Sequence, residues 1–408
     1  MSLEFSTFLT QINDALNNEN GPNLAYLLHP GSPHGKDLVK IFRSPSAASL
    51  SHYKGSIVSP WDDIAIQYVL TCSHIARDRR VDAFKEHSQL VSHFFRFFTE
   101  NRGWTLPALF SVLRDVRDIA YEADWHARVH NQNGECLEEA ARTVAKAFSN
   151  CMVDRVSPPE ESRKWGVYYV AGLAMKCYFR IKHISLTKNV IKALNNTPDI
   201  PPLQRYPRSH QVTYRYYLGM LGFLNEEYVE AERELTFAFY NCVVEAQENQ
   251  TRVNFYLPID PRLLSLEQAN PGIPHSSSDS SRALAIGPIR ASDISAFDRA
   301  IELRKTRLIE LNLLLALERA RELCVRGLFR KAWIISEKTT RMPIALFHSA
   351  LEVSGITVGV EEAECLVANM IYKGYMRGYI SHAKQMVVLA AANAFPSVAE
   401  RLYPYNPL

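Results

Sequence analysis

Hydrophobic residues recur at spacings of three and four along most of this 408-residue chain. The pattern is clear in "DDIAIQYVLTCSHIARD" at residues 62–78, in "ALFSVLRDVRDIAYEADW" at 108–125 and in "LEEAARTVAKAFSNCMV" at 137–153. This period places apolar side chains on one face of a helix, so it predicts an amphipathic α-helix in each segment. Breaks rich in proline and glycine separate such segments with almost no alternating strand pattern between them. The chain is therefore predicted to be a stack of antiparallel helices.

Two segments in the middle of the chain look like diverged copies of one helical hairpin. In "YYLGMLGFLNEEYVEAERELTFAF" (216–239) a small residue is followed by an ordered set of apolar and aromatic positions: Gly219, Tyr228, Ala231, Leu235 and Ala238. The segment 166–194 repeats that order about 44 residues earlier. The order resembles a tetratricopeptide-like hairpin, in which small residues let two helices approach closely. We predict an all-α fold, a right-handed α-solenoid of such hairpins, with a small α+β end.

The α+β end begins at Met342. A helical segment, the β-branched bridge "ITVG" and a second helix are followed by two strand-like runs, "YMRGYIS" and "QMVVLA", joined by "HAK". Helix, strand, helix and hairpin is the order of a winged helix. The resulting division is an N-terminal helical region at 1–160, a helical-repeat subdomain at 161–341 with a mobile loop at 268–288, a winged helix at 342–396 and a tail at 397–408.

The charges of this winged helix indicate which kind of nucleic-acid contact it can make. Its second helix starts with three glutamates, Glu361, Glu362 and Glu364, where a reader of the major groove needs basic or amide side chains. Sequence-specific DNA reading is therefore not expected. The basic residues come later and suit salt-dependent phosphate contacts: Lys373, Arg377, His382 and Lys384. The alternative is a solvated face on a packing module.

Composition narrows the class of protein further. The net charge is only +3, although residues from Gly287 onward carry 16 Lys/Arg and 12 Asp/Glu, so a nucleic-acid site must be a local patch. Seven separate cysteines without a C-x-x-C pair are typical of a reducing compartment rather than of a disulfide framework or a zinc site. We expect no signal peptide and no membrane span. These features are typical of a protein of the cytosol or the nucleus.

The C-terminal half resembles the PCI domain, the scaffold module of the proteasome lid, the signalosome and a translation initiation factor. The residues that carry the resemblance are "GLFRKAW" and "EEAECLVANMIYKGYMRGYISHAKQMVVL". They are similar to one branch of the family, which holds the messenger-RNA export protein with a single PCI domain and the signalosome-subunit-twelve-like proteins. The resemblance extends over about residues 167–396 and is strongest from Arg326 onward.

The resemblance implies a non-catalytic scaffold subunit without a cofactor. Such a subunit pairs through its winged helix with a larger PCI scaffold protein and binds a small acidic disordered subunit shared with the proteasome lid. The paired winged helices form a composite surface that binds RNA or DNA weakly, in transcription-coupled messenger-RNA processing or export. The alternative is a protein-binding scaffold attached to the signalosome without nucleic-acid contact. A free-standing DNA-binding factor is disfavoured by the three glutamates.

Residues for these partners can be placed on the sequence. A basic stripe precedes the winged helix and would suit an acidic disordered partner: Arg319, Arg321, Arg326, Arg330 and Lys331. Tyr375 and Tyr379 are expected at the protein interface as well. The alternative for any one arginine is a solvated helix face that pairs with Glu318 and Glu322.

No pattern of catalytic residues argues for an enzyme. "HPGSPHGK" at 29–36 has one residue too few between its glycines for a phosphate-binding loop, and Asp37 follows its lysine. The chain contains no H-E-x-x-H, G-x-S-x-G or G-x-G-x-x-G. We therefore expect no catalytic residue, no metal site and no cofactor.

Overall fold

The computed structural model describes residues 5–42, 45–129, 134–155, 157–225, 227–243, 249, 289, 291–310 and 314–398. The chain divides into two compact units, residues 1–217 and residues 218–408. The predicted loop at 268–288 and most of the predicted tail at 397–408 lie outside the described residues. The domain boundaries after residues 160 and 341 stay predictions. Within the described part, no helix has the length and apolar character needed to cross a membrane.

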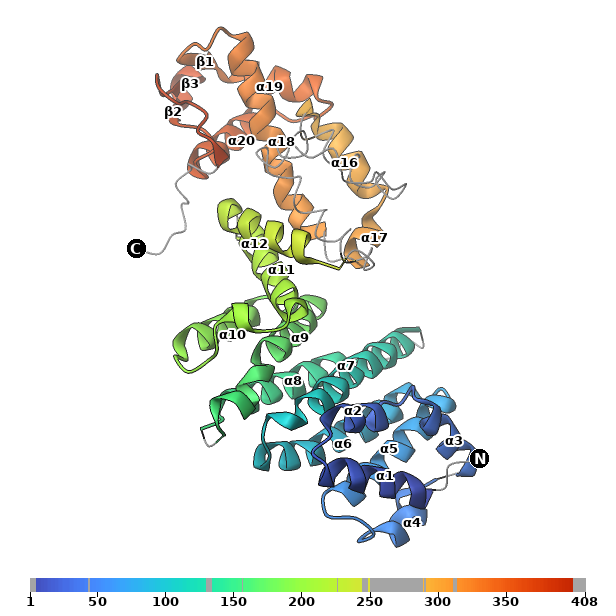
Figure 1. The fold of residues 1–408 in the computed structure, drawn as a ribbon. Coiled ribbons are helices and arrows are strands. Elements are labelled where there is room, and N and C mark those ends of the chain that lie inside the picture. Colours follow the sequence, from blue (N-terminus) through green and yellow to red (C-terminus); the bar gives the residue numbers. More distant parts are fainter. Residues whose placement is uncertain are drawn as a thin grey trace. The chain divides into compact units, whose positions relative to one another are not determined.

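The N-terminal unit is helical (Figure 1). Its helices are α1 (Phe5–Asn17), α2 (Gly21–Leu28), α3 (Pro33–Ile41), α4 (Ala47–Leu50), α5 (Trp61–Ala76), α6 (Arg80–Glu100), α7 (Leu106–Val129), α8 (Cys136–Met152), α9 (Val167–Arg180), α10 (Ser185–Asn196) and the first part of α11 (Arg208–Leu224). From α5 to α9 each helix packs on the next one along the chain, as in a helical-repeat stack. The three helices predicted from periodicity are confirmed as α5, α7 and α8.

The C-terminal unit joins a helical part to a small sheet. It contains the end of α11, then α12 (Tyr228–Asn241), α16 (Ile294–Glu302), α17 (Lys305–Glu310), α18 (Leu314–Ile335), β1 (Arg341–Pro343), α19 (Ile344–Val353), α20 (Val360–Tyr372), β2 (Gly378–Ser381) and β3 (Met386–Leu389). The predicted fold class, all-α with a small α+β end that forms a winged helix, is confirmed.

The hairpin of α11 and α12 shows why a small residue was needed there. A Cβ atom on Gly219 would lie 2.5 Å from Cγ of Leu235, so only glycine lets the two helices approach this closely. Ala231, Leu235 and Ala238 are buried between the helices, as the repeat pattern predicts.

The sheet of the winged helix corrects one prediction. The strands are antiparallel in the order β1-β3-β2, with Met342 opposite Val387 and Ile380 opposite Val387 on its other side. The third strand therefore precedes the first helix, and the bridge "ITVG" between the helices is not a strand. In β1 the Met342 side chain is buried and its two neighbours are exposed, as expected for a strand at the edge of a core. An alternation of only three residues is too short to be recognised in the sequence.

Candidate protein and nucleic-acid interface

The two helices and the sheet of the winged helix share one apolar core. Phe347 of α19, Val367 of α20 and Val387 of β3 are completely buried. Gly374 ends α20 in the left-handed conformation, at a φ of +73°, and so turns the chain toward β2. The core fixes which side chains of the sheet face outward.

Two of the three glutamates at the start of α20, Glu362 and Glu364, are engaged within the fold. A carboxylate oxygen of Glu362 accepts the backbone N–H of Gly359 at 3.1 Å and so caps the helix. Oε1 of Glu364 lies 2.8 Å from Nδ1 of His382 on the turn of the wing. The start of α20 thus presents two carboxylates that satisfy groups of the winged helix itself, and the absence of base reading stays a prediction.

Two of the four predicted phosphate-contacting residues are paired with carboxylates. Lys373 forms an ion pair with Glu322 of α18, and His382 is held by Glu364. Arg377 and Lys384 are exposed, and their side chains have no hydrogen-bond or ion-pair partner in the described part of the chain. The structure places them just before and just after β2. They are the members of the predicted set that remain open to a ligand.

The outward face of the sheet adds a residue that sequence reasoning missed. Arg341, Val388 and Tyr379 lie opposite one another across the three strands, and the Tyr379 side chain is 63% exposed. Arg341 is exposed too. Arg341 was not predicted as a site residue because the winged helix was expected to begin one residue later, at Met342, with a helix. Strand β2 is an edge strand, which offers alternate backbone groups for pairing with another chain.

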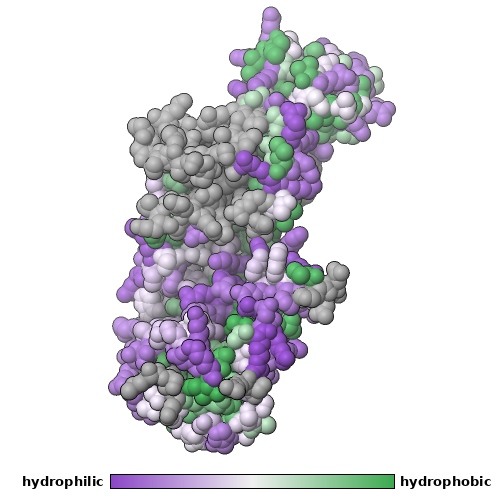
Figure 2. Space-filling view, turned by 90° about the vertical axis from the view of Figure 1, so that its right-hand side faces the viewer, coloured by the Kyte–Doolittle hydropathy of each residue, from purple (hydrophilic) through white to green (hydrophobic). Residues whose placement is uncertain are grey.

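Hydrophobic side chains are also exposed on the helices of the winged helix. Leu346 and Val353 of α19, and Val360 and Tyr372 of α20, are exposed. In Figure 2, green patches interrupt the hydrophilic surface of this part of the chain, at the top of the view. Exposed apolar residues close to an unpaired strand edge are typical of a surface that binds protein.

The predicted basic stripe of α18 consists mainly of residues that hold the C-terminal unit together. Arg321 makes two hydrogen bonds, of 2.8 and 2.9 Å, to Asp298 of α16. Nη2 of Arg326 donates to the carbonyl of Pro396 at 2.6 Å, and Nζ of Lys331 donates to the carbonyl of Ala291 at 2.6 Å. Arg321 does not pair with Glu318 or Glu322, so the alternative pairing is wrong for that residue.

The other residues predicted to bind partners differ in accessibility. Arg319 and Arg330 are exposed on α18. Tyr375 is only 1% exposed, because its ring belongs to the core of the winged helix. It therefore positions the start of the wing and offers no surface to a partner, whereas Tyr379, four residues later, does.

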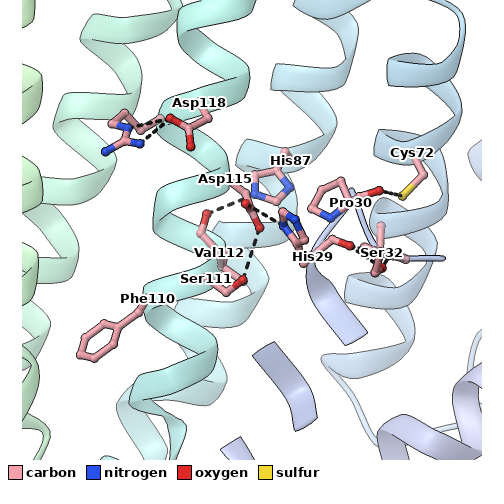
Figure 3. Close-up of polar contacts among 12 residues, drawn as sticks. His29, Pro30, Ser32, Cys72, His87, Phe110, Ser111, Val112, Asp115 and Asp118 are labelled. Atoms are coloured by element: carbon pink, nitrogen blue, oxygen red, sulfur yellow. Dashed lines mark hydrogen bonds and ion pairs between the residues drawn. The ribbon is translucent and has the colours of Figure 1, made fainter. Parts of the chain in front are cut away.

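A second group of polar residues lies in the N-terminal unit, around the segment that resembles a phosphate loop (Figure 3). Nδ1 of His29 lies 3.0 Å from Oδ1 of Asp115, a buried carboxylate of α7. The Ser32 hydroxyl lies 3.1 Å from the Tyr68 hydroxyl, and Nε2 of His34 donates to the carbonyl of Leu27 at 2.7 Å. These bonds satisfy buried groups within the helical stack.

Burial shifts the pKa values of two side chains in this region in the direction that favours their neutral forms. Burial raises the pKa of the Cys72 thiol to about 12, so the thiol stays protonated. Burial lowers the pKa of His87, whose Nε2 lies 3.2 Å from the carbonyl of Val112. Among the described residues, no group of three or more His, Cys, Asp or Glu side chains is arranged to hold a metal ion.

Comparison with known proteins agrees with the geometry of the winged helix. The PCI domain family matches residues 302–390, which run from the end of α16 to just past β3. Protein CSN12 homolog of Schizosaccharomyces pombe is 34% identical over 425 residues, covering 97% of this chain and 98% of the relative. PCI domain-containing protein 2 of Xenopus laevis is 25% identical over 402 residues, covering 97% and 98%. The chain therefore belongs to the branch of PCI-domain proteins that includes the CSN12 homologues and PCI domain-containing protein 2.

Proposed function

We propose that this chain is a non-catalytic, nuclear scaffold subunit whose winged helix pairs with a larger PCI-domain protein. In this proposal the pair also binds a small acidic disordered subunit and forms a composite surface for RNA or DNA in messenger-RNA processing or export. The observation that carries the proposal is the exposed sheet face of the winged helix. There an edge strand carries the solvent-exposed Tyr379, Arg341 lies in the same row of the sheet, and Arg377 and Lys384 flank the edge strand.

Protein pairing is supported by the chemistry of that face. An aromatic ring next to a free strand edge can be buried by a partner strand, while the edge gains backbone hydrogen bonds. The exposed apolar side chains of α19 and α20 would be removed from water by the same partner. The acidic subunit is assigned to the exposed cations of α18, Arg319 and Arg330.

Pairing is tested by a charge placed on the sheet. Tyr379→Asp should lower recovery of the PCI partner in a tagged pull-down at least tenfold, because a carboxylate would have to be desolvated in the interface. Tyr240→Asp is the matched control, since Tyr240 of α12 is 61% exposed and Tyr379 is 63% exposed. Equal recovery with the two variants would contradict the proposed surface, and recovery of no PCI protein by the wild-type chain would contradict the pairing itself.

Nucleic-acid binding by the complex is tested by reversing charge. Arg377→Glu with Lys384→Glu should weaken RNA binding by the purified complex and should make the slope of log K against log salt shallower by about 0.7 for each lost contact. Lys188→Glu with Lys192→Glu, on the exposed side of α10, is the control for total charge. If both pairs lower affinity equally, the wing has no special part in binding.

A second candidate function is a protein-binding scaffold of the signalosome without nucleic-acid contact. The pairing of Lys373 with Glu322 and of His382 with Glu364 favours it, since both pairs reduce the positive charge of the wing. This function would be supported if the complex bound no RNA at either low or high salt and the pull-down recovered signalosome subunits. Imaging of a fluorescent fusion tests the proposed nuclear location.

A further inference from the structure

Helix α7 has two different sides, and Figure 3 shows both. Ser111 and Asp115 point toward His29 and His87, into the buried part of the unit. Phe110 and Asp118 point the other way, toward the side where α9 packs. On that second side the helical period places Arg114, Arg117, Tyr121 and Trp125 in one row, at spacings of three and four. All of them are exposed except Arg117, which is half-buried.

The aromatic residues of this row are presented to solvent. Trp125 is 62% exposed, and its indole makes no ring contact with any residue that the structure describes. A tryptophan is usually among the most buried side chains, so such an exposed ring is informative. Tyr121 is exposed as well, and the Arg180 guanidinium lies over its ring at 4.5 Å from the centroid. Arg180 also donates a hydrogen bond to the Tyr121 hydroxyl, which holds the two planar groups together.

Helix α9 adds two cations on this side, and three carboxylates of α7 are bound by groups of the fold. Lys176 and Arg180 lie one turn apart on α9. Asp118 is paired with Arg117, and Glu122 is paired with Arg80 of α6. The carboxylate of Asp124 is buried and accepts the N–H groups of Cys136 and Leu137, at 2.9 and 3.0 Å.

The row continues into half-buried rings at its other end. The rings of Phe110 and Tyr169 are 4.0 Å apart, and His210 of α11 lies 5.6 Å from Phe110. The Tyr169 hydroxyl donates to the carbonyl of Phe110 at 3.3 Å. Burial raises the pKa of Tyr169, and the positive charges of Arg114 and Arg117 oppose that rise. Aromatic and basic side chains therefore alternate along one side of α7.

We propose that this side of the N-terminal unit binds single-stranded RNA or DNA. The surface, named here the α7–α9 face, consists of Arg114, Tyr121 and Trp125 of α7 with Lys176 and Arg180 of α9. Arg117 of the same row is held by Asp118. Bases stack on exposed aromatic rings and on guanidinium planes, while the cations contact the phosphates. From Arg114 to Trp125 the helix extends about 16 Å, at 1.5 Å per residue, enough for three or so nucleotides. The proposal needs no partner subunit and is independent of the winged helix.

The test measures binding of a fluorescein-labelled 12-nucleotide oligouridylate to the full chain by anisotropy. Trp125→Ala should weaken binding about tenfold, the effect of losing one stacked base, and Trp125→Phe should restore most of it. Tyr26→Ala is the matched control, because Tyr26 of α2 is 55% exposed in the same unit and should have no effect. Oligothymidylate should bind with similar affinity if stacking on single strands is the basis, and a duplex should compete poorly.

The same variants are then combined with Arg377→Glu and Lys384→Glu. The Trp125→Ala effect should persist at full size in that background, whereas loss of the effect would assign it to the wing and overturn the α7–α9 face. No binding of either oligonucleotide at 50 mM salt would overturn the proposal as well. Binding of poly-glutamate but not of oligouridylate would also overturn it, since the face would then accept an acidic peptide. None of these results depends on the pull-down that tests pairing of the winged helix.

Discussion

The basic side chains that join segments of the C-terminal unit differ in their surroundings from those beside the exposed rings of α7 in the N-terminal unit. In the C-terminal unit, Lys373, Arg321 and Arg326 are bound to a carboxylate or a carbonyl on another segment. In the N-terminal unit, Arg180 lies over an exposed ring, and Arg114 has no side-chain partner within the described residues. Cations of the first kind hold segments together, and those of the second kind lie beside exposed aromatic rings or at the surface.

The difference teaches that the number of cations is a poor guide to a nucleic-acid site. Residues 287–408 carry 16 Lys/Arg and 12 Asp/Glu, yet carboxylates and carbonyls of the same unit bind several of those cations. A cation that is paired in this way must lose its partner before it can bind a phosphate at full strength. The N-terminal unit, residues 1–217, carries 26 Lys/Arg and 21 Asp/Glu, and it presents some of its cations beside exposed aromatic rings.

The largest expected effect compares Arg326, which joins two segments of the C-terminal unit, with Arg180, which lies over an exposed ring. Arg326→Ala should lower the free energy of unfolding of the C-terminal unit by about 2 kcal/mol, because it removes a charge-assisted hydrogen bond to Pro396 and the packing of a largely buried side chain. Arg180→Ala, in the N-terminal unit, should cost less than about 1 kcal/mol. Urea unfolding gives the free energies, and hydrogen exchange of peptides from α18 and 390–396 assigns the loss to the correct unit. Equal costs for the two variants would remove the contrast.

Acid should act on the N-terminal unit through its buried histidines. Burial lowers the pKa of His210 to about 4, and it lowers the pKa values of His34 and His87 as well. Unfolded histidine binds a proton near pH 6.5, so between pH 6.5 and about 4 the unfolded chain binds more protons than the folded one, and stability falls as the pH falls. For His210 the loss amounts to about 1–3 kcal/mol by pH 4.

The measurement for this effect is urea unfolding at pH 7 and pH 4.5, with hydrogen exchange of α7, α9 and α11. His210→Phe should reduce the pH dependence, since phenylalanine can pack against Phe110 and Tyr169 without taking up a proton. If the variant keeps the full dependence on pH, His210 does not contribute and the acid sensitivity resides elsewhere.

Much of the fold could be predicted because helical periodicity and glycine positions are local signals. The helices at 62–78, 108–125 and 137–153, the close approach at Gly219 and the cap at Gly374 could all be recognised from neighbouring residues. Strand β1 was missed because three residues carry too little alternation, and its strand character comes from pairing with β3, more than 40 residues away. Arg341 was missed with it.

The candidate site was harder to predict because it depends on contacts between distant segments. The sequence places Lys373 among basic residues, but Glu322, which neutralises it, lies 51 residues earlier. Tyr375 and Tyr379 look equivalent in the sequence, yet one is buried in the core and the other is exposed on the sheet. The α7–α9 face was not recognised, since Arg180 meets Tyr121 only when α9 packs on α7.

The smallest expected effect tests whether carboxylates lower the affinity of the wing for RNA. Glu322→Gln weakens the hold on Lys373, so single-stranded RNA should bind the complex about two- to threefold more tightly at low salt. Glu318→Gln is the matched control, because it removes the same charge from an exposed position one turn earlier on α18 and leaves the pair intact. Anisotropy titrations at 50 and 200 mM salt measure the difference. If the two variants gain affinity equally, total charge alone explains the gain, and the pairing of Lys373 does not set the strength of the wing.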